Sequence, residues 1–497
     1  MGIIAKQSIK GTVVTYIGVA IGFVTTFFVL TRFLTTEEVG LSRVMIDAAT
    51  FFVGLAQLGT SNSIIRFFPY FKDGETNHGF FFWTLVVPFI GFVLFSIIYW
   101  VCHIPLAAWF GDKSPLFVHY YYLVLPIAFF MLYQTIFETN ANVLMNIVVP
   151  RAVREMGTRI GLLIVYLLYA FRIISMDGFV ISLCAVYAVC SLINLVYLFS
   201  LGKISLHPDW AFLRENSEVV RRYLLYTGFL IVSALASTVA PLLSSFFISA
   251  QMGLDYNGIF AIATYMAVMV SIPYRSVTAI ASPELAKTIK EQDTMQTSRL
   301  MRQCAGNLLL IGGFILLLIW VNIDLIYIIL PNGATYASAR NVVLILGFSQ
   351  LILATFNITL NTLNYSRFYA FSLLWSLMLT GMIIVLNNLL IPRYGMEGAA
   401  ISNLLSYAFY FMMIVTTVCL TTHTSPFAWS QLKTMGLLVS IFVINELWLR
   451  FLPMSNLWLS SMMRTLVLLG TGIFVAYRLN LSEEINALFR RIFISRH

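Results

Sequence analysis

The chain has 497 residues, of which 60% are apolar and only 10% are charged, and its mean hydropathy is +0.88. Soluble domains carry about 25% charged residues, so this composition excludes a soluble globular protein and indicates a chain that crosses a membrane many times. The net charge of +9 does not indicate nucleic-acid binding, because the positive residues fall in short segments between apolar stretches, where they set membrane orientation.

The sequence predicts an all-α polytopic membrane protein with about fourteen transmembrane helices, since each span needs roughly 20 mainly apolar residues. No alternating ten-residue pattern indicates a β-barrel. The fifth predicted span, over 158–171, is short. In chain order the spans centre on Gly22, Gly54, Gly91, Ile127, Ile164, Val189, Leu235, Val268, Phe314, Leu353, Thr380, Phe409, Phe442 and Leu469.

Two stretches of the sequence resemble each other. Thr35–Val44 and Met252–Ala261 both follow an apolar segment, place an acidic residue shortly before a glycine (Gly40 and Gly258) and lead into a predicted helix. Parallel repeats of this kind are a common transporter architecture, with the substrate site between the two halves. The spacing therefore predicts two six-helix lobes around a central cavity, followed by two C-terminal helices.

The expected domain boundaries follow from this count. The N-terminal lobe takes residues 1–205, and the C-terminal lobe takes 206–424 and starts with an amphipathic helix over 207–222. Residues 425–497 form the two extra spans and an amphipathic tail. By this assignment 21 of the 30 lysines and arginines lie on the side of the two termini, eight lie opposite, and Arg275 falls inside a span. The positive-inside rule then places both termini in the cytoplasm.

Three asparagines mark one face of the tenth predicted span. Asn357, Asn361 and Asn364 are separated by four and three residues within an apolar run, which places their amides on the same side of a helix. Amides in hydrocarbon are costly unless a polar group faces them. The face is therefore expected either to line a water-filled cavity or to form hydrogen bonds with a neighbouring span.

Other polar side chains lie in or at the ends of apolar spans: Arg275, Asp47, Gln134 and Glu138. A pathway through the membrane would account for all four. Asp47 follows Arg43 by one turn. It is therefore expected either to form a local ion pair with Arg43 or to be the carboxylate that couples transport to H⁺ or Na⁺. Glu138 is either a second carboxylate that couples transport to an ion or a side chain that is simply solvated. Sugar contacts are expected from Gln134 and from Tyr16, Thr25, Thr26, Ser237, Ser244, Asn357, Asn361 and Asn403.

The sequence predicts no catalytic, metal or cofactor site. The five cysteines are scattered without a CxxC pair, and no GxxxxGK[ST] loop or HExxH motif occurs. The N-terminus carries no evident cleavage site and is expected to be a first span rather than a removed signal peptide.

The first 80 residues carry a family resemblance. Lys6–Thr12, Leu30–Gly40 and Leu58–Pro69 resemble the opening of bacterial polysaccharide flippases of the Wzx type. These belong to a superfamily that also includes multidrug and toxic compound extruders and lipid II flippases. The resemblance implies a bundle that opens alternately to each side of the bacterial inner membrane, and a substrate that is an undecaprenyl-diphosphate-linked oligosaccharide moved to the outer leaflet. It implies membrane lipid and polysaccharide assembly proteins as partners.

The resemblance also implies a role for two arginines. Arginines on the corresponding helices of lipid II flippases are implicated in diphosphate capture, which we carry over to Arg275 and Arg66. A planar guanidinium donates to two phosphate oxygens at once. The alternative for Arg66 is a positive-inside anchor, and for Arg275 it is a structural ion pair.

Three other functions remain open at this stage. A multidrug extruder would normally have twelve spans and an acidic cavity. A lipid II flippase would share the diphosphate chemistry. An integral glycosyltransferase or polymerase is less favoured, because no large external loop and no acidic cluster for a metal-bound sugar nucleotide are present.

Overall fold

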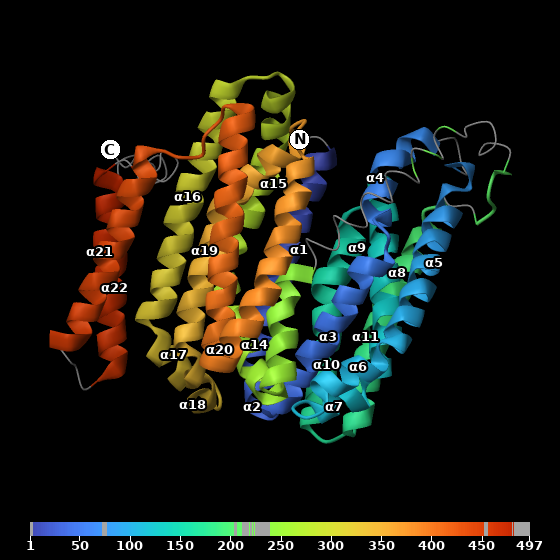
Figure 1. Ribbon diagram of the computed structural model, residues 1–497, viewed down its shortest axis with the longest axis horizontal. Helices are drawn as coiled ribbons and strands as arrows, with labels where there is room; N and C mark the ends of the chain where they lie inside the picture. Colours follow the sequence, from blue (N-terminus) through green and yellow to red (C-terminus); the bar gives the residue numbers. More distant parts are fainter. Residues whose placement is uncertain are drawn as a thin grey trace. The chain divides into compact units, whose positions relative to one another are not determined.

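The computed structural model describes residues 3–71, 77–202, 206–210, 239–451 and 456–479, with single residues at 218, 221, 223 and 481, and side chains are described from Val14 onward. Within these residues every regular element is a helix (Figure 1). The chain divides into two compact units, Met1–Ala261 and Ile262–His497. The expected boundaries at residues 205 and 424 stay a prediction.

The first unit is built from long helices joined by short turns. Two of these helices contain π-helical segments, η1 (Thr25–Leu30) and η4 (Val153–Gly157). The α-helices are α1 (Ile3–Val24), α2 (Thr31–Phe33), α3 (Thr36–Ala56), α4 (Thr60–Phe71), α5 (Phe80–Val101), α6 (His103–Phe110), α7 (Pro115–His119), α8 (Val124–Val143), α9 (Val148–Ala152), α10 (Thr158–Ala170), α11 (Met176–Ser200), an unlabelled helix Val239–Gln251, and the start of α14 (Leu254–Val268).

Local sequence signals explain where these helices begin. At α3 the Thr35 hydroxyl accepts a hydrogen bond from the Glu38 amide, and the Glu38 carboxylate accepts one from the Thr35 amide at 2.8 Å. This reciprocal capping box satisfies two amides that a helix leaves unpaired. At α11 the Ser175 side chain caps the first turn in the same way, by accepting from the Gly178 amide.

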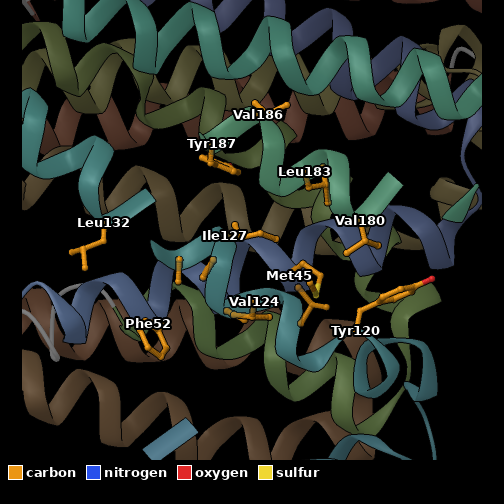
Figure 2. Close-up of a cluster of buried hydrophobic side chains, with 14 of the residues drawn as sticks. Met45, Phe52, Tyr120, Val124, Ile127, Leu132, Val180, Leu183, Val186 and Tyr187 are labelled. Carbon is orange, nitrogen blue, oxygen red and sulfur yellow. The ribbon is translucent and has the colours of Figure 1, made fainter. Parts of the chain in front are cut away.

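The core of the first unit lies where α3, α8 and α11 pack together (Figure 2). Met45 on α3 and Val124 and Ile127 on α8 are completely buried there, against Leu183 of α11. Between membrane spans the lipid is as apolar as the side chains, so close packing rather than escape from water holds such a core together.

The second unit places α16 (Thr294–Val321), α19 (Arg340–Tyr365) and α20 (Ala370–Thr422) side by side (Figure 1). The helix α20 is 53 residues long and contains two predicted spans, which meet at Gly395, where φ is 57° and ψ is −135°. The remaining helices are the end of α14, α15 (Ile272–Lys290), α17 (Ile323–Ile329), α18 (Gly333–Tyr336), α21 (Trp429–Phe451) and α22 (Leu457–Arg478).

The predicted all-α polytopic fold is confirmed. Among the described residues, ten helices are long and apolar enough to cross a membrane. The prediction of fourteen is larger because α20 holds two spans, Leu235 lies outside the described residues, and α10 and α21 are not among the ten. Every other predicted span centre falls inside a helix. The two predicted amphipathic segments, 207–222 and 481–494, lie almost entirely outside the described residues.

The two similar stretches of sequence pack against each other within the first unit. A Cβ atom on Gly40 of α3 would overlap the carbonyl oxygen of Leu254, and one on Gly258 of α14 would overlap the carbonyl oxygen of Thr36. The contact is reciprocal, because each glycine faces the residue four positions before the other. The Thr36 hydroxyl also donates to Asp255 Oδ1 at 2.6 Å. Glycine is required here because the two backbones touch.

Replacing Gly258 by Ala should therefore destabilise the protein by about 1–3 kcal/mol, the usual cost of overpacking. The matched control is Gly381→Ala on α20, where an added Cβ meets nothing within 4 Å. That substitution should be neutral or slightly stabilising, because alanine favours a helix by about 1 kcal/mol over glycine. Melting curves of the purified protein in detergent measure both, and equal melting temperatures for the two variants would contradict the glycine crossing.

Candidate functional site

A cluster of polar side chains lies where α15 meets α19 in the second unit. It consists of Tyr274 and Arg275 on α15 and Asn357 and Asn361 on α19, and we call it the α15–α19 site. The Tyr274 hydroxyl donates a hydrogen bond to Asn357 Oδ1 at 2.7 Å. The side chain of Asn361 also lies close enough to the Tyr274 hydroxyl to interact with it. Both helices belong to segments that are apolar and long enough to cross a membrane.

Each helix positions its residues for a simple reason. A short 3-10 turn, Met269–Ser271, separates α14 from α15, and Pro273 occupies the first turn of α15, where a missing amide proton costs nothing. Tyr274 and Arg275 follow directly. The helix α19 runs without interruption for 26 residues, so residues four apart lie one above the other on one face. Asn357 and Asn361 therefore both reach the same tyrosine.

The amide face of α19 points away from the packed interior of the second unit. Asn357 and Asn361 are half-buried and Asn364 is exposed, whereas Ile358, Thr362 and Leu363 on the other side of the helix are buried. Asn357 accepts a hydrogen bond from Tyr274 on the neighbouring helix. This agrees with the interpretation that the amide face bonds to a neighbouring span. Asn364 is exposed, and the water-filled cavity of the other interpretation stays a prediction.

Arg275 is exposed, and no carboxylate among the described residues forms an ion pair with it. The alternative of a structural ion pair is therefore not seen in the described part of the chain. Next to the site, Tyr365 at the end of α19 has 45% of its surface exposed and interacts electrostatically with Tyr274. The site thus combines a cation, two amides and two phenol rings.

Arg66, the other predicted phosphate ligand, lies on α4 in the first unit. It is exposed, and its guanidinium lies 5.8 Å from the centre of the Phe67 ring. Its position near the end of a span fits the interpretation as a positive-inside anchor as well as a role in binding.

A network of charged residues surrounds Glu138 of α8. Arg154 contacts Glu138 Oε1 at 2.9 Å and Glu155 Oε1 at 3.1 Å, and Arg159 contacts Glu155 Oε2 at 3.4 Å. Arg159 also donates to the backbone carbonyl of Gly18 on α1 at 2.6 Å. We call these four charged residues the Glu138 network. It ties α1, α8 and the π-helical segment η4 together.

Gln134 lies one turn before Glu138 and is buried, and its amide donates to the Thr158 hydroxyl at 3.2 Å. This contact holds α8 against α10. Asp47 is buried on α3, and its carboxylate accepts from Arg43 Nε at 2.8 Å. The local pair expected from the spacing is present.

The remaining predicted sugar contacts differ in their surroundings. Thr25 and Asn403 donate to carbonyls four residues earlier in their own helices, at 2.8 and 3.0 Å, the self-contained arrangement that such residues often adopt. Tyr16 is exposed, whereas Thr26 and Ser244 are buried. Ser237 lies outside the described residues.

Sequence reasoning missed four residues that the structure brings into these clusters: Tyr274, Arg154, Glu155 and Arg159. The two arginines were counted only as orientation charges, although Glu155 and Arg159 stand four residues apart, which favours a pair on one helix. Tyr274 left no such signal, because its partners lie on a helix more than eighty residues away. Within the described residues, no group of three or more His, Cys, Asp or Glu side chains is arranged to hold a metal ion.

Comparison with solved structures identifies the fold. The chain is similar to the lipid II flippase MurJ in an inward closed conformation, with a TM-score of 0.70 and 10% identity over 95% of this chain and 99% of that one. It is similar to an inward-facing multidrug resistance MATE family transporter of the MOP superfamily, with a TM-score of 0.63 and 13% identity over 82% and 96% of the two chains. It is also similar to a MOP superfamily transporter from Pyrococcus furiosus (TM-score 0.56, 14% identity, 84% and 96% covered).

At the level of sequence, a comparison with curated proteins finds no match. The family model described as polysaccharide biosynthesis protein matches residues 4–288, which is more than half of the chain. These three solved structures are a flippase and two transporters rather than enzymes. The chain has the fold of the MOP superfamily and belongs to the polysaccharide biosynthesis protein family.

Proposed function

We propose that this protein is a flippase that moves an undecaprenyl-diphosphate-linked oligosaccharide from the inner to the outer leaflet of the bacterial inner membrane. The observation that carries the proposal is the α15–α19 site, where Arg275 is exposed within a membrane-spanning segment and follows Tyr274, the tyrosine that is bonded to Asn357. A cation in a span is costly and marks a functional site by default. The family match supports the link to polysaccharide synthesis.

The residues of the site suit the two polar parts of such a substrate. The Arg275 guanidinium provides a planar fork for the diphosphate. Asn357, Asn361 and Asn364 supply amide donors and acceptors for sugar hydroxyls, and the phenol ring of Tyr365 supplies an apolar face beside them. The lipid tail needs no polar partner and can stay in the bilayer.

Energetics allow transport without a coupling ion. The cell interior is electrically negative, so moving the anionic diphosphate outward is favourable. The free energy falls by about 2.3 kcal/mol for each negative charge per 100 mV of membrane potential. Coupling to H⁺ or Na⁺ through Asp47 or Glu138 is the alternative, since both are buried carboxylates. Each of them already has an arginine partner, which favours a structural role.

Two other functions compete with this proposal. The similarity to a MATE transporter favours a multidrug extruder, but a cationic site would repel the cations that an acidic cavity attracts. The similarity to MurJ favours lipid II as the substrate. Lipid II carries the same diphosphate, so these two flippase functions differ only in the sugar part of the head group.

Replacing Arg275 by Ala should lower export at least tenfold, because a charge-assisted hydrogen bond contributes about 1.5–3 kcal/mol. Lys should restore part of the activity, since it keeps the charge but loses the fork. Mass spectrometry of lipid-linked sugars that accumulate in cells, beside an assay of exported polysaccharide, measures the effect. Arg299→Ala on α16 is the matched control, an exposed arginine outside the site, and equal export by both variants would remove Arg275 from the pathway.

Replacing Glu138 by Gln separates the two roles of this carboxylate. We expect a lower melting temperature and normal export per folded molecule, because the substitution removes a buried counter-charge from Arg154, whose side chain is 49% exposed against 6% for Glu138. The double variant Glu138→Gln with Arg154→Gln should recover part of the stability. Unchanged melting together with loss of the response to an imposed proton gradient would instead assign ion coupling to Glu138.

Orientation in the membrane is tested by labelling single cysteines in a variant that lacks the five native ones. A cysteine at Met295, which is 84% exposed, should react only with reagents that enter the cytoplasm. A cysteine at the exposed Asp112 should react in intact spheroplasts. The reverse pattern would place both termini outside the cytoplasm.

A further inference from the structure

Tyr274 stands at the centre of the α15–α19 site and is not itself part of the predicted set of ligands. Its ring is half-buried, and its hydroxyl meets both half-buried amides of α19. A phenol has one proton to donate and two lone pairs that accept. The proton goes to Asn357 Oδ1 at 2.7 Å, so Asn361, whose side chain also interacts with this hydroxyl, can bond to it only by donating from its amide nitrogen.

This arrangement fixes the direction of both amides. An asparagine side chain can turn over and exchange its donor for its acceptor, and the hydrogen-bond partners decide which way it faces. With Oδ1 of Asn357 held by Tyr274, its Nδ2 donors are left to face outward. With Nδ2 of Asn361 held by the same hydroxyl, its Oδ1 acceptor is left. Among the described residues, neither amide has a further side-chain partner beyond Tyr274.

We propose that Tyr274 is a positioning residue that presents one donor, from Asn357, and one acceptor, from Asn361, to the sugar part of a saccharide diphosphate lipid. The two groups are one helical turn apart, about 5.4 Å, and Arg275 follows Tyr274 in the chain. A sugar hydroxyl is both donor and acceptor, so a fixed donor–acceptor pair recognises hydroxyls in one arrangement and rejects others. This inference rests on the proposed function.

The proposal divides recognition between neighbouring residues. Arg275 binds the diphosphate, which every such lipid carries. This binding depends on the guanidinium charge and not on the Tyr274 hydroxyl. The oriented amides read the sugar. A purely structural role for Tyr274, as one interhelical hydrogen bond among many, would instead affect stability and leave the two parts of the substrate equally well bound.

The test uses the purified full-length protein and two probes, undecaprenyl diphosphate without sugar and the lipid-linked saccharide extracted from cells that lack the gene. Tyr274→Phe keeps the ring and removes only the hydroxyl. It should bind the bare diphosphate lipid as the wild type does, and it should bind the saccharide lipid at least tenfold more weakly than the wild type. Its melting temperature without ligand should change little. Tyr394→Phe, at an exposed tyrosine of α20, is the matched control and should change neither affinity.

The outcomes separate the two hypotheses. If the wild type binds the saccharide lipid more tightly than the bare lipid and Tyr274→Phe keeps that preference, the positioning role is wrong and the proposed function stands. If the wild type binds the two lipids equally well, the positioning role is also wrong and the proposed function also stands. If the wild type binds neither lipid, the proposed function fails and this inference fails with it.

Discussion

Every polar group that the chain carries into the membrane must find a partner, because hydrocarbon offers none. In the first unit the buried carboxylates of three acidic residues meet this requirement inside the protein. Asp47 has Arg43, and Glu138 and Glu155 share Arg154, while Arg159 reaches back to the α1 backbone. The close crossing at Gly40 and Gly258 serves the same end, since backbones that touch leave no room for lipid between them.

The second unit meets the requirement differently at the α15–α19 site. The amides there are partly satisfied by Tyr274, but Arg275 has no acidic partner among the described residues and remains exposed. A charge that the fold leaves open has to be satisfied by water or by an anion. The open Arg275, inside a segment long and apolar enough to cross a membrane, is therefore the physical basis for proposing substrate binding at α15 and α19.

Much of the fold follows from the order of apolar residues alone, because length and hydropathy suffice to predict a span. The spacing of Asn357, Asn361 and Asn364 likewise predicts a shared face, since helical periodicity is local. Partners across helices are not local. Tyr274 meets an amide 83 positions away, and nothing in a single sequence says that α15 and α19 are neighbours. Glu138 and Arg154 were each visible in the sequence, but the turn that brings them together was not.

A flippase must recognise its substrate and then let it go. An exposed arginine suits this need, because solvent screens its charge and keeps the gain from each phosphate contact modest. If the protein bound the lipid too tightly on one side of the membrane, it would not release the lipid on the other side. Selectivity for the sugar must then come from groups whose direction is fixed before the substrate arrives, since a preorganised donor and acceptor discriminate without adding much affinity. The tyrosine-held amides have that property, and the exposed Asn364, which has no hydrogen-bond partner among the described residues, does not.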